Sequence, residues 1–320
     1  MNDTAAPARM LAVRQETAGG PEVLKLVETD RPVPNVGEVL VRVRAAGVNP
    51  VDWKTRARGF YYTGQTPPFG LGYDVSGTVE AVGDGVTVHA PGDEVYGMPR
   101  FPHPAGAYAQ YVTAPARHFA PRPRGLDHVR AAALPLAALT AWQALVDTAG
   151  VSEGQRVLIH AAAGGVGHLA VQIAKARGAY VIGTASTAKH DFLRGLGADE
   201  LIDYRERDFA EAVADVDVVL EAISGDYPLR SLTTLRPGGT LVSLLPLAEP
   251  VLAAARERGV RAARIMVEPD LGGLRGITEL VESGRLRTEV ATVLPLADAA
   301  EAHRLGETGR TTGKIVLSVD

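Results

Sequence analysis

The amino-acid sequence predicts an α/β protein in which a β-rich first domain accompanies a doubly wound parallel sheet. Up to about residue 125, short apolar stretches are separated by Gly-Asp and Pro-Gly turns, which is typical of a β-rich domain. From residue 126 onward, helical and strand patterns alternate, which favours a parallel sheet with helices between its strands. A strand, a glycine-rich turn, a helix and a second strand over 156–183 lie early in this alternation.

The strand pattern of the first domain is clearest near residue 40. Val39, Val41 and Val43 occupy alternate positions, which predicts a strand with one buried face. Turn signals follow at Gly83-Asp84-Gly85 and at Pro91-Gly92-Asp93. These breaks keep the apolar stretches short, as a β-rich domain requires.

The alternating part begins with a predicted helix over Val129–Ala149 and continues with six predicted strands. After residue 268 a helix, a strand near Val290–Leu294, another helix and a last strand, Lys314–Val319, break the alternation. We therefore expect domains of 1–125 completed by 268–320, and of 126–267. The six strands are Arg156–His160, Ala179–Thr184, Glu200–Asp203, Asp217–Glu221, Thr240–Leu244 and Ala262–Val267.

The glycine-rich turn carries a dinucleotide-binding pattern with alanine in its first position, Ala162-x-Gly164-x-x-Gly167. Small residues are needed because the backbone must approach a pyrophosphate closely, and free N–H groups at the helix start can then bind it. A glycine-rich turn of some other α/β domain is the alternative, but the flanking strands and helix favour the dinucleotide. The predicted cofactor contacts here are Ala162, Gly164, Gly165, Val166 and Gly167.

The end of the second strand indicates which dinucleotide is bound. NAD-binding units usually place an acidic residue about 20 positions after the glycines, but Thr184 stands there and its neighbours carry no acid. Ser186 and Lys189 instead offer a hydroxyl and an ammonium to a 2′-phosphate. An ordinary helix cap with a solvated lysine is the alternative. The missing acid favours NADPH.

Composition excludes several other classes of function. The chain of 320 residues has 46% hydrophobic and 22% charged residues, as expected for a globular protein with room for two domains. A net charge of −4 gives nucleic-acid binding no electrostatic support. No cysteine is present, so disulfides, thiolate zinc sites and a cysteine nucleophile are excluded. The start lacks the apolar core of a signal peptide, and we expect a cytoplasmic protein.

Motifs along nearly the whole chain resemble the zinc-free quinone oxidoreductase branch of the medium-chain dehydrogenase/reductases. The resemblance implies a GroES-like substrate domain built from both chain ends, a Rossmann domain between them and a catalytic cleft at their junction. The motifs are AGVNPVD at 46–52, GYDVSG at 72–77, GDEV at 92–95, ALTAW at 138–142, HAAAGGVG at 160–167, LGAD at 196–199 and GKIVL at 313–317.

The same resemblance implies further cofactor contacts. Tyr204 would join Ser186 and Lys189 at the 2′-phosphate. On the nicotinamide side the resemblance implies Asn49, Thr140 and the backbone around Ser243, with Ile223 and Ser224 lining the dinucleotide cleft.

The resemblance also bears on the metal. Zinc-dependent alcohol dehydrogenases of this superfamily have a cysteine ligand where this chain has Asn49, and a His-Glu pair where it has Tyr73-Asp74. The eight histidines show no i, i+3 or i, i+4 pairing that would supply another site. We therefore expect no metal, and hydride addition to a quinone or to the β-carbon of an enone. The segment Asn49 to Lys54 resembles enone reductases most.

Four side chains are candidates for substrate contact or catalysis. Hydride addition leaves negative charge on the acceptor oxygen, and Lys54 or Tyr73 could donate a hydrogen bond to it. Tyr61 and Tyr62 are predicted to touch the substrate from a loop. The alternative is that Asn49 and Asp52 only start a helix and that Lys54 is solvated. Water can protonate the enolate, so no general acid is required.

The sequence thus predicts an NADPH-dependent, zinc-independent reductase of enones or quinones that forms a homodimer through the edge strand Ala262–Val267. A quinone reductase proper, a reductive step in a biosynthetic pathway and a non-catalytic NADPH-binding protein are the alternatives. Neither nucleic acid nor a membrane is expected as a partner.

Overall fold

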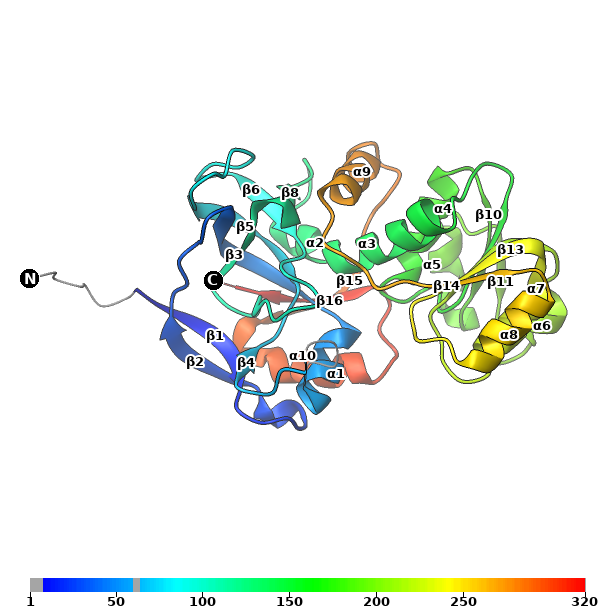
Figure 1. The fold of residues 1–320 in the computed structure, drawn as a ribbon, viewed down its shortest axis with the longest axis horizontal. Helices are drawn as coiled ribbons and strands as arrows, with labels where there is room; N and C mark the ends of the chain where they lie inside the picture. Colours follow the sequence, from blue (N-terminus) through cyan, green and yellow to red (C-terminus); the bar gives the residue numbers. More distant parts are fainter. Residues whose placement is uncertain (1–7, 60–63, 320) are drawn as a thin grey trace, which may run out of the picture. The chain divides into compact units, whose positions relative to one another are not determined.

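The computed structural model describes residues 8–59 and 64–319, which form two compact units (Figure 1). The first unit comprises Met1–Leu136, Glu268–Thr278 and Glu289–Asp320, and the second comprises Ala137–Val267 and Glu279–Thr288. The division therefore falls about ten residues later than the expected boundary at 125/126, and a short part of the C-terminal tail belongs to the second unit.

The first unit is built on two sheets. Among the described residues, a seven-stranded sheet has the order β15-β16-β3-β5-β6-β8, with β7 also paired to β3, and a three-stranded sheet has the order β2-β1-β4. The C-terminal strand β16 thus pairs with β3 from the N-terminal part of the chain. The strands are β1 Arg9–Gln15, β2 Lys25–Asp30, β3 Glu38–Val48, β4 Phe69–Gly70, β5 Asp74–Val82, β6 Glu94–Gly97, β7 Tyr111–Pro115, β8 Phe119–Pro121, β15 Val290–Pro295 and β16 Lys314–Ser318.

Strand β3 alternates between buried and exposed residues only from Val41 to Arg44, because Leu40 is buried as well. Val39, Val41 and Val43 are buried, whereas Arg42 and Arg44 are exposed. The helices of this unit are α1 Pro50–Arg58, α2 His128–Ala132 and α10 Ala299–Glu307, and α9 Leu271–Glu282 crosses from one unit to the other.

The second unit contains the predicted doubly wound sheet. Six parallel strands have the order β11-β10-β9-β12-β13-β14. Strands β9 to β11 are added toward one edge of the sheet and β12 to β14 toward the other, so the strand order reverses between β9 and β12. Figure 1 draws α4 and α5 on one side of these strands and α7 and α8 on the other. The elements are β9 Arg156–Ile159, β10 Tyr180–Thr184, β11 Glu200–Ile202, β12 Val216–Glu221, β13 Leu235–Ser243, β14 Arg261–Arg264, α3 Pro135–Trp142, α4 Gly167–Ala176, α5 His190–Arg194, α6 Phe209–Ala212, α7 Tyr227–Thr234 and α8 Glu249–Glu257.

Three predicted elements differ clearly from the structure, and one of them, the strand predicted over Thr240–Leu244, begins five residues earlier, at Leu235. The single helix over Val129–Ala149 is wrong, because α2 ends before Pro135 and the chain then continues as α3 and a π-helical turn, Gln143–Thr148. Proline lacks an N–H and clashes with the preceding turn, so it starts a new helix here. The last strand of the sheet also begins and ends earlier than predicted, at Arg261–Arg264.

Among the helices that the structure describes, none is both long and apolar enough to cross a membrane.

Candidate active site

The glycine-rich turn lies between β9 and α4, at the carboxyl edge of the parallel sheet. Ala161 adopts the left-handed conformation with φ of 50°, which is unusual for a residue other than glycine. A Cβ atom on Gly167 would lie 2.3 Å from the carbonyl oxygen of Ala161, so only glycine allows the helix to start this close to the strand. The glycine at position 167 therefore allows a tight turn between β9 and α4, as the sequence pattern predicts.

The turn is suited to an anion. Gly164 N–H donates to the carbonyl of Ala161 at 2.9 Å, which closes the turn. Gly165 and Val166 immediately precede the ten-residue helix α4. Their N–H groups donate to no backbone carbonyl of the described residues. Free N–H groups and the positive end of a helix dipole are what a pyrophosphate requires.

The end of β10 brings Ser186 and Lys189 onto one turn. Lys189 N–H donates to the carbonyl of Ser186 at 2.8 Å. Asp203 directly follows the neighbouring strand β11, and its carboxylate accepts from both the N–H and the hydroxyl of Thr187 at 2.6 Å. These bonds bring the loop with exposed Tyr204 to the same edge of the sheet. Ser186, Lys189 and Tyr204 therefore gather at neighbouring strand ends.

Electrostatics at this edge add one residue that the sequence reading missed. The hydrogen bonds from Thr187 lower the pKa of Asp203 to about 2, so this carboxylate is ionised and committed to its loop. Burial, followed by the positive charge of Arg205, lowers the pKa of Lys189. The guanidinium of Arg205 lies 5.6 Å from the ring centre of Tyr204. Two cations, Lys189 and Arg205, therefore share this edge.

The remaining strands end at the same edge with the other predicted cofactor residues. Ile223 N–H, after β12, donates to the carboxylate of Glu221 at 2.8 Å, and Ser224 is exposed beyond it. The hydroxyl of Ser243, at the end of β13, is bonded to the backbone of Leu245. Thr140 is buried in α3. Parallel strands place their carboxyl ends together, so residues far apart in sequence line one edge.

In the first unit, three polar side chains far apart in sequence meet in a buried cluster. The Nδ2 of Asn49 donates to Asp74 at 2.8 Å, and the ammonium of Lys314 lies 3.3 Å from the same carboxylate and also bonds to Asn49 Oδ1. Leu136 N–H donates to the other oxygen of Asp74 at 2.7 Å. Lys314 is only 3% exposed and Asp74 is fully buried. The amide of Asn49 is therefore committed to Asp74 and Lys314.

A second buried carboxylate, Asp52, lies on the first turn of α1. It accepts from the N–H of Asn49 at 2.7 Å, from Gly72 N–H at 3.2 Å and from the hydroxyl of Tyr108 at 3.0 Å. Burial raises the pKa of Asp52 to about 7 against these hydrogen bonds. The hydroxyl of Tyr108 also lies 3.4 Å from His303 Nε2. Asp52 therefore does help to start the helix, and it also fixes the loop between β4 and β5 that contains Tyr73.

The predicted catalytic side chains do not meet in this cluster. Lys54 is exposed on α1, and the lysine that contacts Asn49 is Lys314. Tyr73 is 1% exposed and packs edge-on against Phe101 at a centroid distance of 5.0 Å, a placement that favours a packing role. Burial raises the pKa of its hydroxyl. The predicted substrate contacts Tyr61 and Tyr62 lie outside the described residues.

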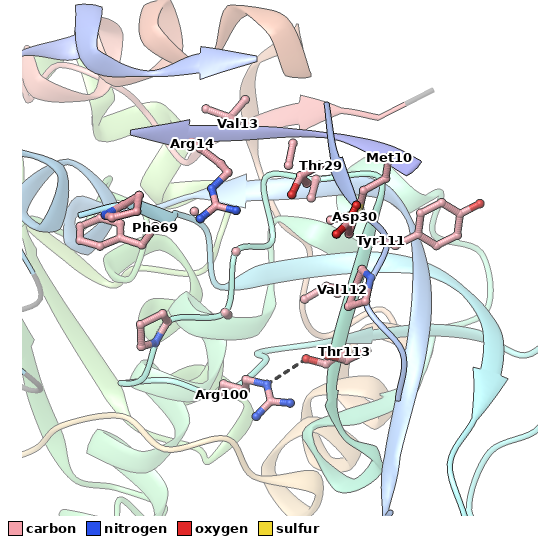
Figure 2. A pocket seen from close by; sticks show the side chains of 18 of the residues that line it. Met10, Val13, Arg14, Thr29, Asp30, Phe69, Arg100, Tyr111, Val112 and Thr113 are labelled. Carbon is pink, nitrogen blue, oxygen red and sulfur yellow. Dashed lines mark hydrogen bonds between the residues drawn. The ribbon is translucent and has the colours of Figure 1, made fainter. Parts of the chain in front are cut away.

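A pocket of about 430 Å³ in the first unit lies away from these residues. Figure 2 shows it between β1 and the loops near Phe69 and Arg100, with Arg14 among the lining side chains. Arg100 donates to the carbonyl of Thr113 at 3.0 Å and pairs with Glu38. None of the described site candidates lines this pocket. Among residues 8–59 and 64–319, no three His, Cys, Asp or Glu side chains are grouped as a metal site would require.

Comparison with known families matches both parts of the chain. Residues 35–124 match the alcohol dehydrogenase GroES-like domain, and residues 196–317 match the family described as zinc-binding dehydrogenase. Both matches belong to one superfamily of two-domain oxidoreductases. The two units described above, one of them with a six-stranded parallel sheet, agree with this class of protein.

Individual relatives agree. A 2-methylene-furan-3-one reductase from Solanum lycopersicum is 34% identical over 97% of this chain and 79% of its own length. A 2-haloacrylate reductase from Burkholderia is 36% identical over 93% of this chain and 96% of its own. A quinone oxidoreductase structure from Coxiella burnetii is 39% identical, with a TM-score of 0.91 over 98% of this chain and all of that one. A mycobacterial structure in complex with NADPH is 32% identical, with a TM-score of 0.86 over 97% and 99%.

The chain belongs to the medium-chain dehydrogenase/reductase superfamily, with quinone oxidoreductases and enone or haloacrylate reductases among its relatives. It is an α/β oxidoreductase with a GroES-like domain and a Rossmann domain, as the sequence predicted. Some relatives are far longer: the chain spans 16% of a mycocerosic acid synthase-like polyketide synthase from Mycobacterium tuberculosis.

Proposed function

We propose that this protein is an NADPH-dependent, zinc-independent reductase of enones or quinones. With an enone, NADPH and a proton give NADP⁺ and the saturated carbonyl compound; with a quinone, they give NADP⁺ and the hydroquinone. NADPH, when bound, supplies the hydride. Hydride adds to the β-carbon of the enone, the resulting enolate takes a proton from water at its α-carbon, and the C=C bond becomes single.

The carboxyl edge of the Rossmann sheet supports the choice of NADPH. Its turn offers the N–H groups of Gly165 and Val166 to a pyrophosphate, with Ala162, Gly164 and Gly167 allowing close approach. Ser186, Lys189, Tyr204 and Arg205 would hold the 2′-phosphate. Asp203, the acid at that edge, is occupied by Thr187, which leaves cations to face the phosphate. The mycobacterial relative bound to NADPH supports the same choice.

The observation that carries the proposed chemistry is the contact of Lys314 with Asn49 and Asp74. In zinc-dependent members of the superfamily, metal ligands stand at the positions of Asn49 and Tyr73. Zinc does not fit the donors found here, since a buried ammonium already lies against Asn49 and Asp74 and would repel a second cation. Without a Lewis acid to stabilise an alkoxide, reduction of an activated acceptor is the natural reaction.

The acceptor is proposed to be an enone, on the resemblance of the segment from Asn49 to Lys54 and on the relative that reduces 2-methylene-furan-3-one. Thr140, Asn49 and the loops at Ile223, Ser224 and Ser243 would lie on the nicotinamide side. A quinone reductase proper is favoured by the Coxiella relative. A reductive step in a biosynthetic pathway and a non-catalytic NADPH-binding protein remain the alternatives.

Lys54 is proposed to donate a hydrogen bond to the acceptor oxygen, since its exposed ammonium lies one turn into α1. Lys54→Ala should then lower kcat by about 100-fold, the usual loss of an oxyanion donor. If Lys54 instead holds the cofactor ribose, KM for NADPH should rise while kcat survives. Lys25→Ala, at an exposed lysine on β2, is the control. If Lys54→Ala keeps the wild-type kcat and KM for NADPH, Lys54 contacts neither the acceptor nor the cofactor and is a solvated surface residue.

The direct test of the function is consumption of NADPH and of NADH with a panel of quinones and enones. We expect turnover with NADPH and an activated acceptor, and much slower turnover with NADH. A binding protein would consume neither cofactor with any acceptor. Faster turnover of a saturated alcohol with NADP⁺ would contradict the proposed reaction.

Removal of metals tests zinc independence. Because Lys314 fills the cation position of the cluster, prolonged dialysis against a chelator should leave the NADPH-dependent activity unchanged, with zinc well below one atom per chain. Activity that is lost to the chelator and restored by zinc would refute this expectation.

We also propose a homodimer. Strand β14 is the edge of the parallel sheet and pairs with β13 alone among the described strands, so a second copy of the strand could extend the sheet there. A sedimentation mass near the 33.6 kDa of one chain would argue against it. The cytoplasmic location stays a prediction from the sequence.

A further inference from the structure

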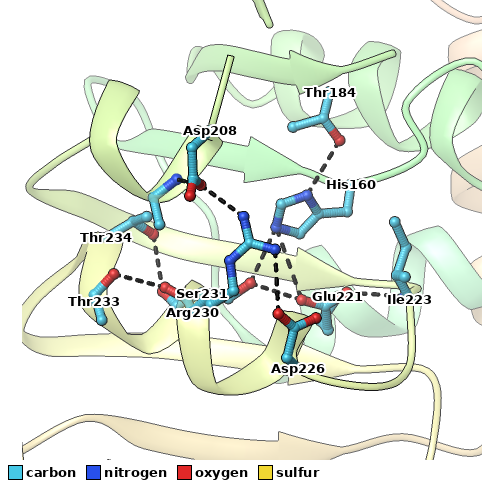
Figure 3. Close-up of polar contacts among 11 residues, drawn as sticks. His160, Thr184, Asp208, Glu221, Ile223, Asp226, Arg230, Ser231, Thr233 and Thr234 are labelled. Carbon is cyan, nitrogen blue, oxygen red and sulfur yellow. Dashed lines mark hydrogen bonds and ion pairs between the residues drawn. The ribbon is translucent and has the colours of Figure 1, made fainter. Parts of the chain in front are cut away.

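A chain of four buried polar side chains runs beneath the carboxyl edge of the Rossmann sheet (Figure 3). Thr184 Oγ1 lies 3.1 Å from His160 Nδ1, His160 Nε2 lies 3.0 Å from Ser231 Oγ, and the Ser231 hydroxyl donates to Glu221 Oε2 at 2.7 Å. All four side chains are at most 1% exposed. They come from the ends of β10, β9 and β12 and from α7, so the chain connects the strand ends that form the proposed dinucleotide site.

The charge of Glu221 determines the direction of this chain. An ionised carboxylate only accepts, so Ser231 must donate to it and must itself accept from His160 Nε2–H. His160 Nδ1 is then bare and accepts from Thr184. If Glu221 takes a proton, it can donate to Ser231 instead, and every bond in the chain reverses: His160 becomes protonated on Nδ1 and Thr184 becomes the acceptor. Both directions give Glu221, Ser231 and His160 a partner for each bond of the chain.

The surroundings favour such a change. Burial raises the pKa of Glu221 to about 7 and, helped by the charge of Arg230, lowers the pKa of His160 to about 3, so His160 stays neutral. In the described part of the chain no lysine or arginine forms an ion pair with Glu221. Besides His160 itself, the charged or titratable groups packed around these four side chains are Tyr227 and Arg230. The ring of Tyr227 lies edge-on to the His160 ring at a centroid distance of 5.3 Å. Arg230 pairs with Asp208 at 2.6 Å and with Asp226 at 3.4 Å.

Glu221 also holds the loop beyond its strand. Its second oxygen accepts the N–H of Ile223, at the start of the loop that contains Ser224. At the other end of the chain, the carbonyl of Thr184 accepts the N–H of Ala162 in the glycine-rich turn at 3.0 Å. The polar chain therefore joins the two segments that the proposed function assigns to the dinucleotide.

We propose that Glu221 is a positioning residue of the dinucleotide site, acting through Ser231, His160 and Thr184, and that binding of the anionic dinucleotide is linked to proton uptake by its carboxylate. This inference rests on the proposed function for the identity of the ligand. Removing a buried, unpaired negative charge near a pyrophosphate strengthens the binding of that anion. The neutral acid is therefore the form that binds more tightly.

The first arm of the test needs no dinucleotide. Nitrogen-15 NMR of the histidine rings, with His160 assigned by its loss in His160→Gln, reports which ring nitrogen carries the proton. At pH 8.5 wild type should show His160 protonated on Nε2. Glu221→Gln has no charge but can donate to Ser231, so His160 should be protonated on Nδ1. An unchanged tautomer would overturn the inference.

The second arm measures Kd for NADPH by its fluorescence at pH 6 and pH 8.5. The 2′-phosphate itself titrates near pH 6, so variants are compared with wild type at each pH. Wild type and Glu221→Gln should bind equally at pH 6, and Glu221→Gln should bind about tenfold more tightly at pH 8.5. Glu211→Gln, at an exposed carboxylate on α6, should match wild type at both.

Ser231→Ala breaks the chain in both directions, and we expect about tenfold weaker binding at both pH values. A ratio between wild type and Glu221→Gln that stays within twofold at both pH values would overturn the proton linkage, even if the tautomer reverses. Failure of wild type to bind NADPH or NADH would instead overturn the proposed function. The tautomer measurement still distinguishes that case, because it tests the chain alone.

Discussion

Two buried carboxylates, Asp74 in the first unit and Glu221 in the second, have opposite kinds of partner. In the first unit the carboxylate of Asp74 is paired with the buried ammonium of Lys314, and Asn49 is bonded to both. In the second unit Glu221 is equally buried but is bonded to neutral partners, Ser231 and the N–H of Ile223. Two cations of that unit, Lys189 and Arg205, lie at the edge of the sheet instead.

This difference distinguishes the cluster around Asp74, which stabilises the fold, from the edge of the parallel sheet, where we propose that a ligand binds. Charges that neutralise each other inside a protein have little left to offer a ligand, whereas cations at the carboxyl edge of a parallel sheet are placed for an anion. The comparison therefore supports a structural role for Lys314 and agrees with the proposed binding of the dinucleotide by Lys189.

The largest expected effect is on the stability of the first unit. Lys314→Met leaves the buried carboxylate of Asp74 without its cation and should lower the free energy of unfolding by about 3–5 kcal/mol, measured by urea titration. Adding Asp74→Asn should recover part of that loss. Lys25→Met, at an exposed lysine, is the control. A loss below about 1 kcal/mol in Lys314→Met would show that the pair does not stabilise the fold.

The second effect is the pH dependence of the stability difference between wild type and Glu221→Gln, in which the contribution of Asp52 cancels. Its folded pKa of about 7 lies above the ordinary value of 4.5, so its contribution to stability is intact below pH 4.5 and is lost as the pH rises through 7. Glu221→Gln should match wild type near pH 4.5 and exceed its free energy of unfolding by about 3 kcal/mol at pH 8.5. A constant difference across this range would mean that Glu221 is not a buried, unpaired acid.

The smallest effect concerns the exposed edge. Lys189→Ala should raise KM for NADPH by about 10- to 100-fold, or about 1.4–2.8 kcal/mol, because one charge-assisted bond to the 2′-phosphate is lost. The value of kcat and the kinetics with NADH should barely change. Arg194→Ala, at an exposed cation on the neighbouring helix α5, is the control. An equal loss with both cofactors would contradict the assignment of Lys189 to the 2′-phosphate.

The sequence predicted the fold class because its signals are local. The dinucleotide turn lies within one strand–turn–helix unit, and the apolar periodicity of the strands around it is regular. Of the residues at the sheet edge, Ser186 was predicted from the residue pattern, whereas Tyr204, Ile223 and Ser243 were implied only by the family resemblance. The structure places all four at one edge because parallel strands end together. The helix over Val129–Ala149 was wrong because its apolar composition hid the effect of Pro135.

The polar clusters could not be predicted, because their members are distant in sequence. Lys314 and Asp74 are 240 residues apart, and a lysine at the start of a strand gives no sign that it is buried. The sequence instead favoured Lys54, which is close to Asn49 along the chain but points from an exposed position. Tyr73 was chosen because zinc-dependent members of the superfamily have a metal ligand at its position, and only the structure shows that it is buried and packed against Phe101. The terminal GKIVL motif was the one available signal for Lys314.

The central claim, hydride addition to the β-carbon of an activated acceptor, is tested most directly by following the hydride itself. NADPH deuterated at the reactive position of C4 is turned over with but-3-en-2-one, and the product is analysed by deuterium NMR. The account predicts butan-2-one with deuterium on the carbon that was β to the carbonyl. An alcohol product with deuterium on the carbon that bears the hydroxyl group would contradict it.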